Sequence, residues 1–408
     1  MTKWQEIKLG DLGEVVTGKT PSTKVDAYWC GDIPFITPKD IQSSKHIFET
    51  ERYLSNEGML SVKGSILPKN AICVSCIGNI GYVSMTTKQS ISNQQINSII
   101  ANDENDANFV YYLMKSLWPY FKNYEGQSTT LSILNKSQFS KIDVCIPKNK
   151  DIQKKIAGVL GALDDKIELN NKINNNLEQQ AQALFKSWFV DKENSERKTI
   201  KAEEFFDISI GKTPPRKEPE WFTNNSDDIV WISISDMGSC GTFISNSSEY
   251  LVKEAISKFN IKIVPDNTVL LSFKLTVGRI AITDGEMTTN EAIAHFVTDK
   301  TEVNEYLYCY LKNFNFQTMG STSSIATAVN SKIIKSMPFV LPTEKELTDF
   351  HVVTYPMFRQ IKANQRENTR LAAIRDALLP KLMSGEIDVS NVDISALTST
   401  DKLSFTEE

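Results

Sequence analysis

Histidine is scarce in this 408-residue chain, and long apolar runs are absent. The three histidines, His46, His295 and His351, come without a G-x-S-x-G pattern, so a hydrolytic triad finds no support. The longest uncharged stretch, residues 70–87, is interrupted by glycine, asparagine and serine, which makes it a poor membrane span. Nothing at residues 1–6 resembles a signal peptide. We therefore expect a cytoplasmic protein without a membrane segment.

Cysteine is also sparse, and its pattern carries no chemistry. The six cysteines do not recur between the two halves of the chain, so we interpret them as reduced thiols. Cys73 and Cys76 form a lone C-x-x-C, and no second pair or nearby histidine completes a zinc site. The Asn/Asp-Pro-Pro-aromatic motif of amino-group methyltransferases is missing as well, TPPR at residues 213–216 being the nearest string. We assign no catalytic and no metal-binding residue.

The chain has no excess of positive charge: its net charge is −5. Residues 1–150 carry 16 Lys and Arg against 14 Asp and Glu, whereas residues 193–342 carry 15 against 19. A surface for nucleic acid must therefore be a local patch rather than a field of the whole molecule.

What the chain does contain is a long repeat, with a spacing of about 195 residues. GKTP at residues 18–21 returns at 211–214, and PFITPKD at 34–40 returns as VWISISD at 230–236. Single residues match too: Gly81 with Gly278, Asn93 with Asn290, Asn135 with Asn330, and Pro147 with Pro342. A period this long indicates two tandem domains that perform one function at two places.

Each half combines a β-rich part with a long helix. Buried strands are expected at 71–75 and 268–272, and helices at 109–116 and 306–313, which favours α+β domains with irregular sheets. The expected organisation is a first domain at 1–150, a helical spacer at 151–192, a second domain at 193–342, a helical spacer at 343–387 and a loose polar tail at 388–408.

The two helical spacers share a heptad stripe in the same register. Its main positions are Leu163, Ile167, Asn170, Asn174, Leu177 and Leu184 in the first helix, and Met357, Ile361, Asn364, Asn368, Leu371 and Leu378 in the second. The asparagines could set the register of a helix pair, or they could face solvent or another protein. Pro356 is expected to start or kink the second helix and Pro380 to end it, which leaves Leu382 outside its regular part.

Residues 13–20 satisfy the phosphate-binding pattern GxxxxGK[ST]. That pattern requires a helix that begins at the Lys-Thr, whereas Pro21 follows here at once, and the second copy has Phe206 in place of Gly13. A P-loop nucleotide hydrolase is therefore only an alternative reading, in which Lys19→Ala would abolish nucleotide turnover. A structural coiled-coil adaptor is the other alternative.

The loops after each glycine suit DNA contacts, because they offer hydroxyls, backbone donors and cations. Serine- and threonine-rich runs at 126–130 and 320–324 offer similar groups. The candidate DNA-binding residues are Lys19, Thr20, Ser22, Lys24, Lys39, Asn79, Gln127, Ser128 and Thr129 in the first half, and Lys212, Thr213, Arg216, Lys217, Lys274, Arg279, Ser321 and Thr322 in the second.

With these motifs in order and in duplicate, nearly the whole chain resembles the specificity (S) subunit of type I restriction–modification enzymes. The most specific segments are the GKTP loop before Tyr28 and Trp29, residues 34–41, and the helical stretches 163–170, 182–189 and 375–385. The resemblance implies two target-recognition domains, separated by two helices in an antiparallel coiled coil with a pseudo-two-fold repeat. Each domain would read one half of a bipartite, asymmetric double-stranded DNA target.

The resemblance also implies partners and cofactors. Two modification subunits would dock on the coiled coil, bind S-adenosylmethionine and methylate adenine N6. Two restriction subunits would use ATP and Mg²⁺ to translocate and cut DNA. This chain itself would bind no cofactor and would be a non-catalytic targeting subunit.

Overall fold

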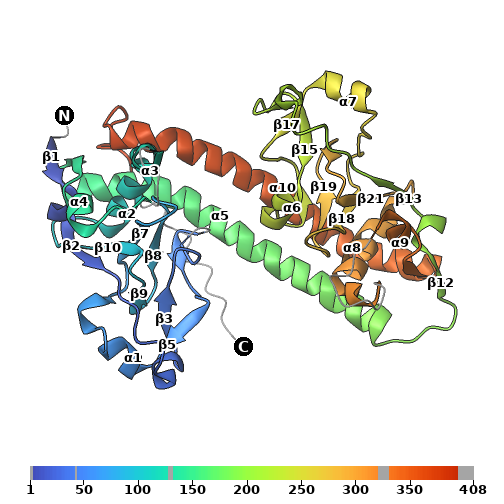
Figure 1. Cartoon of the computed structure of the whole chain (residues 1–408), viewed down its shortest axis with the longest axis horizontal. Helices are drawn as coiled ribbons and strands as arrows, with labels where there is room; N and C mark the ends of the chain where they lie inside the picture. The colour runs from blue at the N-terminus through green and yellow to red at the C-terminus, as the bar shows by residue number, and fades with distance from the viewer. Residues whose placement is uncertain (1–2, 42–43, 127–131, 320–329, 394–408) are drawn as a thin grey trace. The chain divides into compact units, whose positions relative to one another are not determined.

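The computed structural model of the chain describes residues 3–41, 44–126, 132–319 and 330–393. It divides into two compact units, Met1–Glu168 with Thr369–Glu408, and Leu169–Asn368. Each unit holds one α+β domain and a part of each of the two long helices, α5 (Lys150–Phe185) and α10 (Glu344–Met383) (Figure 1). The expected fold class of two α+β domains with two long helices is confirmed.

The first domain is built from three sheets. Its five-stranded sheet has the order β2-β10-β7-β8-β4, its four-stranded sheet the order β5-β3-β9-β6, and β1 pairs with β11. The pairs β3–β9 and β4–β8 are parallel and the others antiparallel, so both larger sheets are mixed. The strands are β1 (Trp4–Lys8), β2 (Gly13–Thr17), β3 (Ile33–Ile36), β4 (His46–Ile47), β5 (Arg52–Leu54), β6 (Ile66–Leu67), β7 (Ile72–Ser75), β8 (Val83–Thr86), β9 (Ser90–Ser92), β10 (Ile96–Ala101) and β11 (Asp143–Pro147).

The second domain repeats this plan with two differences, one at each edge of its four-stranded sheet. Its sheets have the orders β13-β21-β18-β19-β16, β14-β17-β15-β20 and β12-β22. The strand β14 is added beside β17, whereas β6 has no counterpart among the named strands and only a bridge between Val264 and Met287 lies there. The strands are β12 (Lys198–Lys201), β13 (Asp207–Ile210), β14 (Phe222–Thr223), β15 (Ile229–Ile232), β16 (Phe243–Ile244), β17 (Tyr250–Leu251), β18 (Val269–Ser272), β19 (Ile280–Thr283), β20 (Thr288–Thr289), β21 (Ile293–Val297) and β22 (Pro338–Leu341).

The central strands are continuous apolar runs because both of their faces are covered. On β7, Ile72 and Val74 enter one core cluster while Cys73 enters another, as the two-residue period of a strand requires. On β18, Val269 and Leu271 share one cluster and Leu270 lies in a second. The strands expected at 71–75 and 268–272 are therefore present.

The cores also take in the long helices. In the first unit, α2 (Ala107–Ser116) packs in one cluster with Ile156 and Leu160 of α5 and Leu382 of α10. In the second unit, α8 (Asn304–Asn313) shares a cluster with Phe185 of α5 and with residues of α10. The remaining α-helices are α1 (Asn56–Leu60), α3 (Trp118–Gly126), α4 (Lys136–Ser140), α6 (Ile234–Ser239), α7 (Lys253–Phe259) and α9 (Ser331–Lys335).

Neither proline is an end of α10: the helix does not start at Pro356, and the expectation that Pro380 ends it is wrong. The helix begins at Glu344, where Thr343 and Glu346 form reciprocal capping hydrogen bonds, and it passes through both Pro356 and Pro380. Pro356 has no N–H group, so the carbonyl of Val352 lacks its helical hydrogen bond. Both residues are exposed, and water can therefore bind that carbonyl. The helix ends at Met383, just before Gly385 with its positive φ of 76°. Leu382 therefore lies inside the helix, and it is buried.

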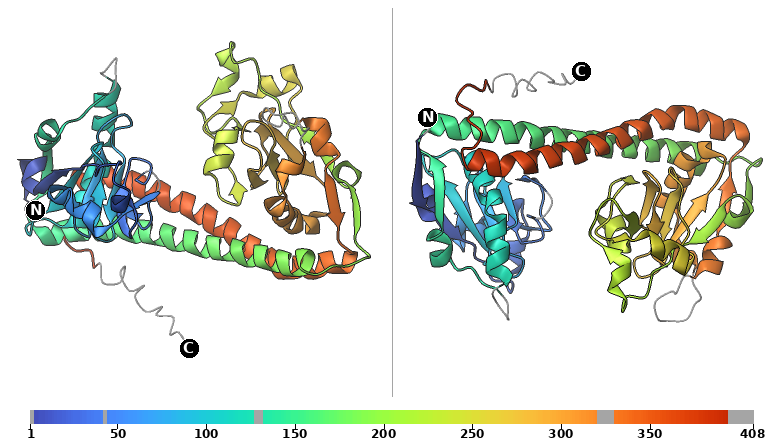
Figure 2. Two further views of the ribbon diagram at one scale, coloured as in Figure 1. Left: turned by 60° about the horizontal axis from the view of Figure 1, so that its bottom comes forward. Right: turned by 90° about the horizontal axis from the view of Figure 1, so that it is seen from above.

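Within each unit the segments of α5 and α10 lie side by side and antiparallel (Figure 2). In the second unit Asn174 is hydrogen-bonded to Asn364, and Asn170 is hydrogen-bonded to Asn368. Residue numbers therefore increase along one helix in the direction in which they decrease along the other. In the first unit Asp164 meets Arg375 in the same sense.

Candidate nucleic-acid interface

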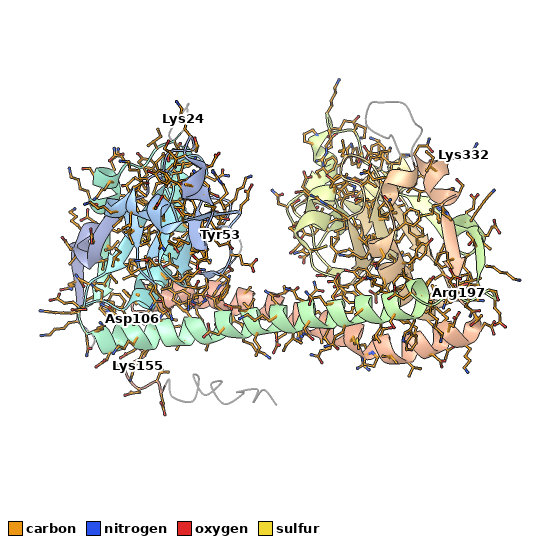
Figure 3. All side chains as sticks on the ribbon, turned by 90° about the horizontal axis from the view of Figure 1, so that it is seen from below. Lys24, Tyr53, Asp106, Lys155, Arg197 and Lys332 are labelled. Atoms are coloured by element: carbon orange, nitrogen blue, oxygen red, sulfur yellow. The ribbon has the colours of Figure 1, made fainter. Side chains whose placement is uncertain are left out.

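The GKTP loop and the loop after the central strand lie at the same end of the five-stranded sheet. The Gly18 N–H donates to the carbonyl of Ile96 over 3.0 Å, and Ile96 pairs in register with Ser75 at the end of β7. In the second domain Gly211 donates to Ile293 over 3.2 Å, and Ile293 pairs with Ser272. We call this edge the loop end of each domain. Figure 3 places Lys24 of this loop at the end of the first domain that lies away from α5.

The repeated glycine and asparagine build the frame of the loop end. A Cβ on Gly18 would lie 2.1 Å from the carbonyl oxygen of Asn93, and one on Gly211 would lie 2.2 Å from that of Asn290. Such distances exclude any side chain there. Asn93 and Asn290 also donate their N–H groups, over 2.9 Å each, to Ile36 and Ile232 of the neighbouring four-stranded sheets. These repeated residues therefore join the two sheets of each domain.

The phosphate-binding reading of residues 13–20 is contradicted. Gly13–Thr17 forms strand β2, and the next helical turn is the 3-10 helix η2 (Asp26–Trp29), so no helix begins at Lys19 and Thr20. Without that helix N-terminus the backbone N–H groups that would hold a phosphate are not assembled.

On the first domain the predicted contact residues are mostly exposed. Lys19, Ser22 and Lys24 present exposed side chains in the loop, and Thr20 donates its hydroxyl to Gln94 over 2.7 Å. Asn79 is exposed in the loop between β7 and β8. These groups lie together at the loop end.

Lys39 lies outside that group. It follows β3, is exposed, and comes within 3.7 Å of Glu51. At such an exposed site the ion pair stabilises little, so the ammonium is available to other anions.

On the second domain several of the corresponding groups are already engaged. Lys212 donates to the carbonyl of Phe259 over 2.6 Å, and Thr213 donates to Glu291. Arg279 donates to the carbonyl of Ile234 instead of pointing into solvent. Lys217 and Lys274 are exposed. The second domain therefore offers fewer unengaged cations, in keeping with its acidic balance.

Gln127, Ser128, Thr129, Ser321 and Thr322 lie outside the described residues. Their predicted contacts with DNA stay predictions.

The loop after the central strand makes the same left-handed turn in both domains with different residues. Gly78 has a φ of 79°, and Leu275, 197 positions later, has a φ of 60°. A leucine in this conformation costs about 1–2 kcal/mol, yet its side chain is 96% exposed and contributes no packing. The turn is therefore common to the two domains, whereas the group at its tip differs.

Sequence reasoning missed Arg52, which the structure brings to the loop. Its guanidinium lies 3.5 Å from the ring centre of Trp29, and the Trp29 indole N–H donates to the carbonyl of Ser22 over 3.1 Å. Arg52 belongs to β5, well away from the loop in the sequence, so no local pattern selected it.

Cys73, Cys76 and His295 are buried and offer no reactive group at this end. Burial raises the pKa of Cys73 and of Cys76 to about 12. Burial also lowers the pKa of His295 to about 4, which keeps it neutral between the hydroxyls of Ser209, at 3.0 Å, and Thr289, at 2.7 Å. Within the part of the chain that the structure describes, no three His, Cys, Asp or Glu side chains gather as metal ligands. No described helix is long and apolar enough to cross a membrane.

The asparagines of the helical stripe contact one another across α5 and α10 in the second unit. Asn364 donates to Asn174 over 2.8 Å, and Asn170 donates to Asn368 over 2.9 Å. Asn170 and Asn364 are 1% and 4% exposed. The two bonds correspond to each other under the repeat, because Asn170 matches Asn364 and Asn174 matches Asn368.

The apolar stripe positions pack around these bonds. Ile361 is buried, and Leu177, Leu184 and Met357 pack against the same core cluster of the second unit. In the first unit Leu378 packs against the core, whereas Leu163, Ile167 and Leu371 are half-buried.

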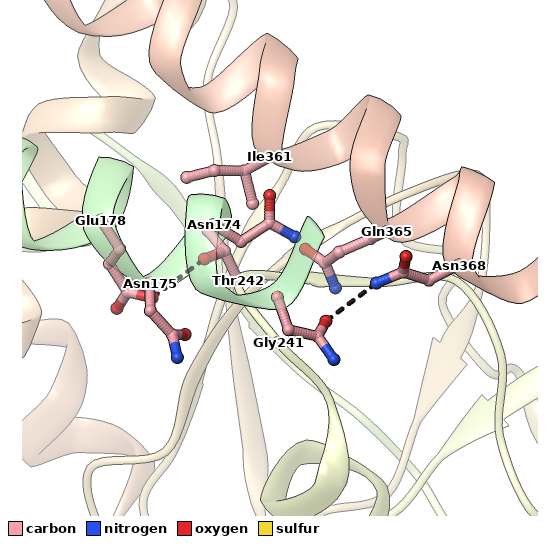
Figure 4. Close-up of a pocket in the computed structure, with 9 residues that line it drawn as sticks. Asn174, Asn175, Glu178, Gly241, Thr242, Ile361, Gln365 and Asn368 are labelled. Carbon is pink, nitrogen blue, oxygen red and sulfur yellow. Dashed lines mark hydrogen bonds between the residues drawn. The ribbon is translucent and has the colours of Figure 1, made fainter. Parts of the chain in front are cut away.

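A polar pocket lies beside the helices in the second unit (Figure 4). Five amide side chains and one carboxylate help to line it: Asn171, Asn174, Asn175, Gln365, Asn368 and Glu178. These side chains can donate and accept hydrogen bonds, which suits a polar protein partner more than a small apolar ligand.

Comparisons with known proteins agree with this architecture. The family model described as type I restriction modification DNA specificity domain matches residues 1–179 and 194–355. The type I restriction enzyme MjaIX specificity subunit of Methanocaldococcus jannaschii is 30% identical over 420 residues, which cover 95% of this chain and 94% of that protein. The HindI specificity subunit of Haemophilus influenzae is 39% identical over 161 residues, 38% of this chain and 35% of that one.

A solved structure shares the fold. The crystal structure of a type I restriction–modification S subunit from M. genitalium superimposes with a TM-score of 0.53 at 18% identity, and covers 93% of this chain and 96% of that one. Two matched specificity domains, each joined to a long helix, and a relative aligned over almost its whole length together show that this chain belongs to the family of type I restriction–modification DNA specificity subunits.

Proposed function

We propose that the chain is the non-catalytic subunit that selects the DNA target of a type I restriction–modification complex, and that each domain reads one half of a bipartite, asymmetric sequence. Both domains carry the same loop frame, so both would approach DNA with the same edge. The side chains on that frame differ, and therefore the two half-sites would differ in sequence.

One observation carries this proposal: equivalent positions of the loop end hold different chemistry. Thr23 corresponds to Arg216, and Gly78 corresponds to Leu275. The two domains share glycine and asparagine at the positions where backbone segments contact each other. They differ at positions whose side chains face solvent. Base edges are read by side chains in a groove, so variation there changes sequence preference without changing the fold.

The long helices supply the second part of the proposal. Their buried asparagine bonds favour one register of α5 against α10, and a fixed register would fix the gap between half-sites. Two modification subunits would dock along these helices, and the amide-lined pocket offers them hydrogen bonds.

The chemistry would belong to those partners. The modification subunits would bind S-adenosylmethionine and methylate adenine N6 after the base leaves the stack, while this chain holds the duplex. Two restriction subunits would supply ATP- and Mg²⁺-dependent translocation and cleavage. The complex would act on DNA in the cytoplasm.

Methylation mapping tests the proposal. The chain is expressed with its modification subunit in a host without adenine methylation, and the genome is read by long-read methylation sequencing. We expect a single bipartite motif with N6-methyladenine in both parts. Absence of any motif, with a modification subunit shown to be active alongside another specificity subunit, would contradict the proposal.

A domain exchange tests whether the two halves are read independently. Residues 1–150 are replaced by the corresponding domain of a relative with another motif. We expect one half of the motif to change and the other half to stay. A modification complex that kept its motif without this chain would instead support the structural adaptor.

A further inference from the structure

An aromatic pair recurs beside the loop end of both domains. Trp29 and Phe35 pack edge to face with ring centres 5.0 Å apart, and Phe222 and Trp231 do so at 5.5 Å. In each pair the tryptophan N–H donates to a carbonyl of the GKTP loop, namely that of Ser22 over 3.1 Å and that of Lys212 over 3.2 Å. The pairs therefore belong to the same edge as the predicted DNA contacts.

Each pair carries an arginine, but the two arginines come from different places. Arg52 of β5 lies 3.5 Å from the ring centre of Trp29, and Arg216 of the GKTP loop lies 4.1 Å from that of Phe222. Under the repeat Arg216 corresponds to Thr23, and the position of Arg52 is held by Glu249, just before Tyr250 of β17. Each domain therefore has a guanidinium group on its aromatic pair, but the two arginines occupy positions that do not correspond under the repeat.

The two guanidinium groups differ in what occupies their N–H edge. Arg216 donates to both oxygens of Glu249, over 2.8 Å and 2.9 Å. Among the residues that the structure describes, no carboxylate forms an ion pair with Arg52. Both side chains are exposed, so the unoccupied edge of Arg52 faces solvent while that of Arg216 is filled.

We propose that Arg52, held flat on Trp29, contacts a guanine in the half-site of the first domain, and that Glu249 closes the equivalent position in the second domain. A guanidinium stacked on a ring loses rotamer freedom and keeps its N–H fork in one plane. That fork matches guanine O6 and N7, the commonest specific contact of arginine in the major groove. This inference rests on the proposed function.

The test uses the complete chain with its modification subunits. The motif is determined for the wild type, for Arg52→Ala, for Arg52→Lys and for Lys8→Ala, and the domain exchange assigns each half-site to its domain. Arg52→Ala is expected to relax one G·C position of the first half-site by about tenfold or more and to leave the second half unchanged. Arg52→Lys is expected to relax the same position, because lysine has no fork, and it covers the case in which the alanine variant does not fold.

Lys8→Ala is the control in the first domain, because Lys8 pairs with Asp143 outside the loop end, and it is expected to leave both half-sites unchanged. An Arg52→Lys complex with the wild-type motif would overturn the proposal, since charge alone would then suffice. A uniform loss of methylation with the motif intact would overturn it too, because that is the signature of a phosphate contact. A wild-type complex without a bipartite motif would refute the proposed function itself, an outcome distinct from both.

Discussion

Leu275 is a strained residue whose side chain gains nothing from the fold that surrounds it. Its φ of 60° lies in the left-handed region, and the residue is 96% exposed. Leu275→Gly should raise the free energy of unfolding by about 0.5–1 kcal/mol, because relief of strain exceeds the entropy cost of glycine. Calorimetric unfolding of the full chain measures this change.

Gly78→Ala is the matched reverse change. It places a Cβ in a turn with a φ of 79° and should lower stability by about 1 kcal/mol. Equal stability of all three proteins would show that neither backbone is held in this conformation in solution.

Glu346 gives a prediction for pH dependence. Hydrogen bonding to Arg197 lowers the pKa of Glu346 from 4.5 to about 2. A carboxylate with a depressed pKa stabilises the fold above its unfolded pKa, and this contribution is lost as the pH falls toward about 2. Glu346→Gln, which keeps the capping geometry, should therefore cost about 1–2 kcal/mol at pH 7, and the difference should shrink below pH 4.5.

Denaturant unfolding of both proteins between pH 7 and pH 3 measures this effect. Glu344→Gln is the control, because Glu344 is exposed in the same helical turn and, among the described residues, forms no ion pair with an arginine. An equal effect of the two substitutions would mean that the helix dipole, and not Arg197, stabilises the charge of Glu346.

At the scale of elements, the buried asparagines link α5 to α10. Asn364→Ala leaves the side-chain oxygen of Asn174 buried without its donor, so we expect a loss of about 1–3 kcal/mol. Replacing both residues by leucine should restore much of the stability but weaken the choice of register. Chemical denaturation measures the first effect, and under the proposed function the gap length of the methylation motif would report the second.

Asn175→Ala is the control for this pair, since Asn175 follows Asn174 on α5 but its side chain is exposed. If it costs as much as Asn364→Ala, the bond between the helices is not the source of the stability. A double-leucine variant that keeps a single gap length would show that the apolar positions alone select the register.

The helical elements also show where local patterns mislead. The heptad stripe correctly indicated two long helices, but the prolines were poor boundary markers for α10. Both prolines lie on the exposed side, where water can reach the carbonyl that loses its hydrogen bond, and burial of Leu382 favours continuation past Pro380. Which side of a helix faces solvent depends on tertiary packing, and a proline in the sequence carries no such information.

At the scale of the whole molecule, the two domains contact helix residues of opposite charge at equivalent positions. His46 lies 3.3 Å from Glu168 of α5, whereas Asp266 and Asp284 each lie 3.1 Å from Lys362 of α10. Glu168 and Lys362 correspond under the repeat. Exchanging residues 1–150 with 193–342 would therefore place the aspartates against Glu168 and should destabilise the chain by about 1–2 kcal/mol.

Thermal unfolding checks this prediction, with a decrease of the midpoint by several degrees expected for domains of this size. Combining the exchange with Glu168→Lys and Lys362→Glu should restore the midpoint. An exchanged chain as stable as the original would show that the domains are interchangeable and that these charges do not assign each to its place.

Much of this protein follows from the sequence by itself, because its main signals are local or periodic. The repeat of about 195 residues, the continuous apolar runs of β7 and β18 and the heptad stripe indicated two α+β domains and two long helices. The runs and the stripe reflect which side chains are buried, because a strand covered on both faces is apolar throughout and a helix seam is apolar every three or four residues.

Only the tertiary structure decided the details of the candidate interface. Arg52 reaches Trp29 of η2 from strand β5, and Gly18 packs against the carbonyl of Asn93, far along the chain. Such contacts depend on strand order and register, which bring together residues without any common spacing. The repeat therefore determined where the two domains are alike, and long-range packing decided how their exposed groups differ.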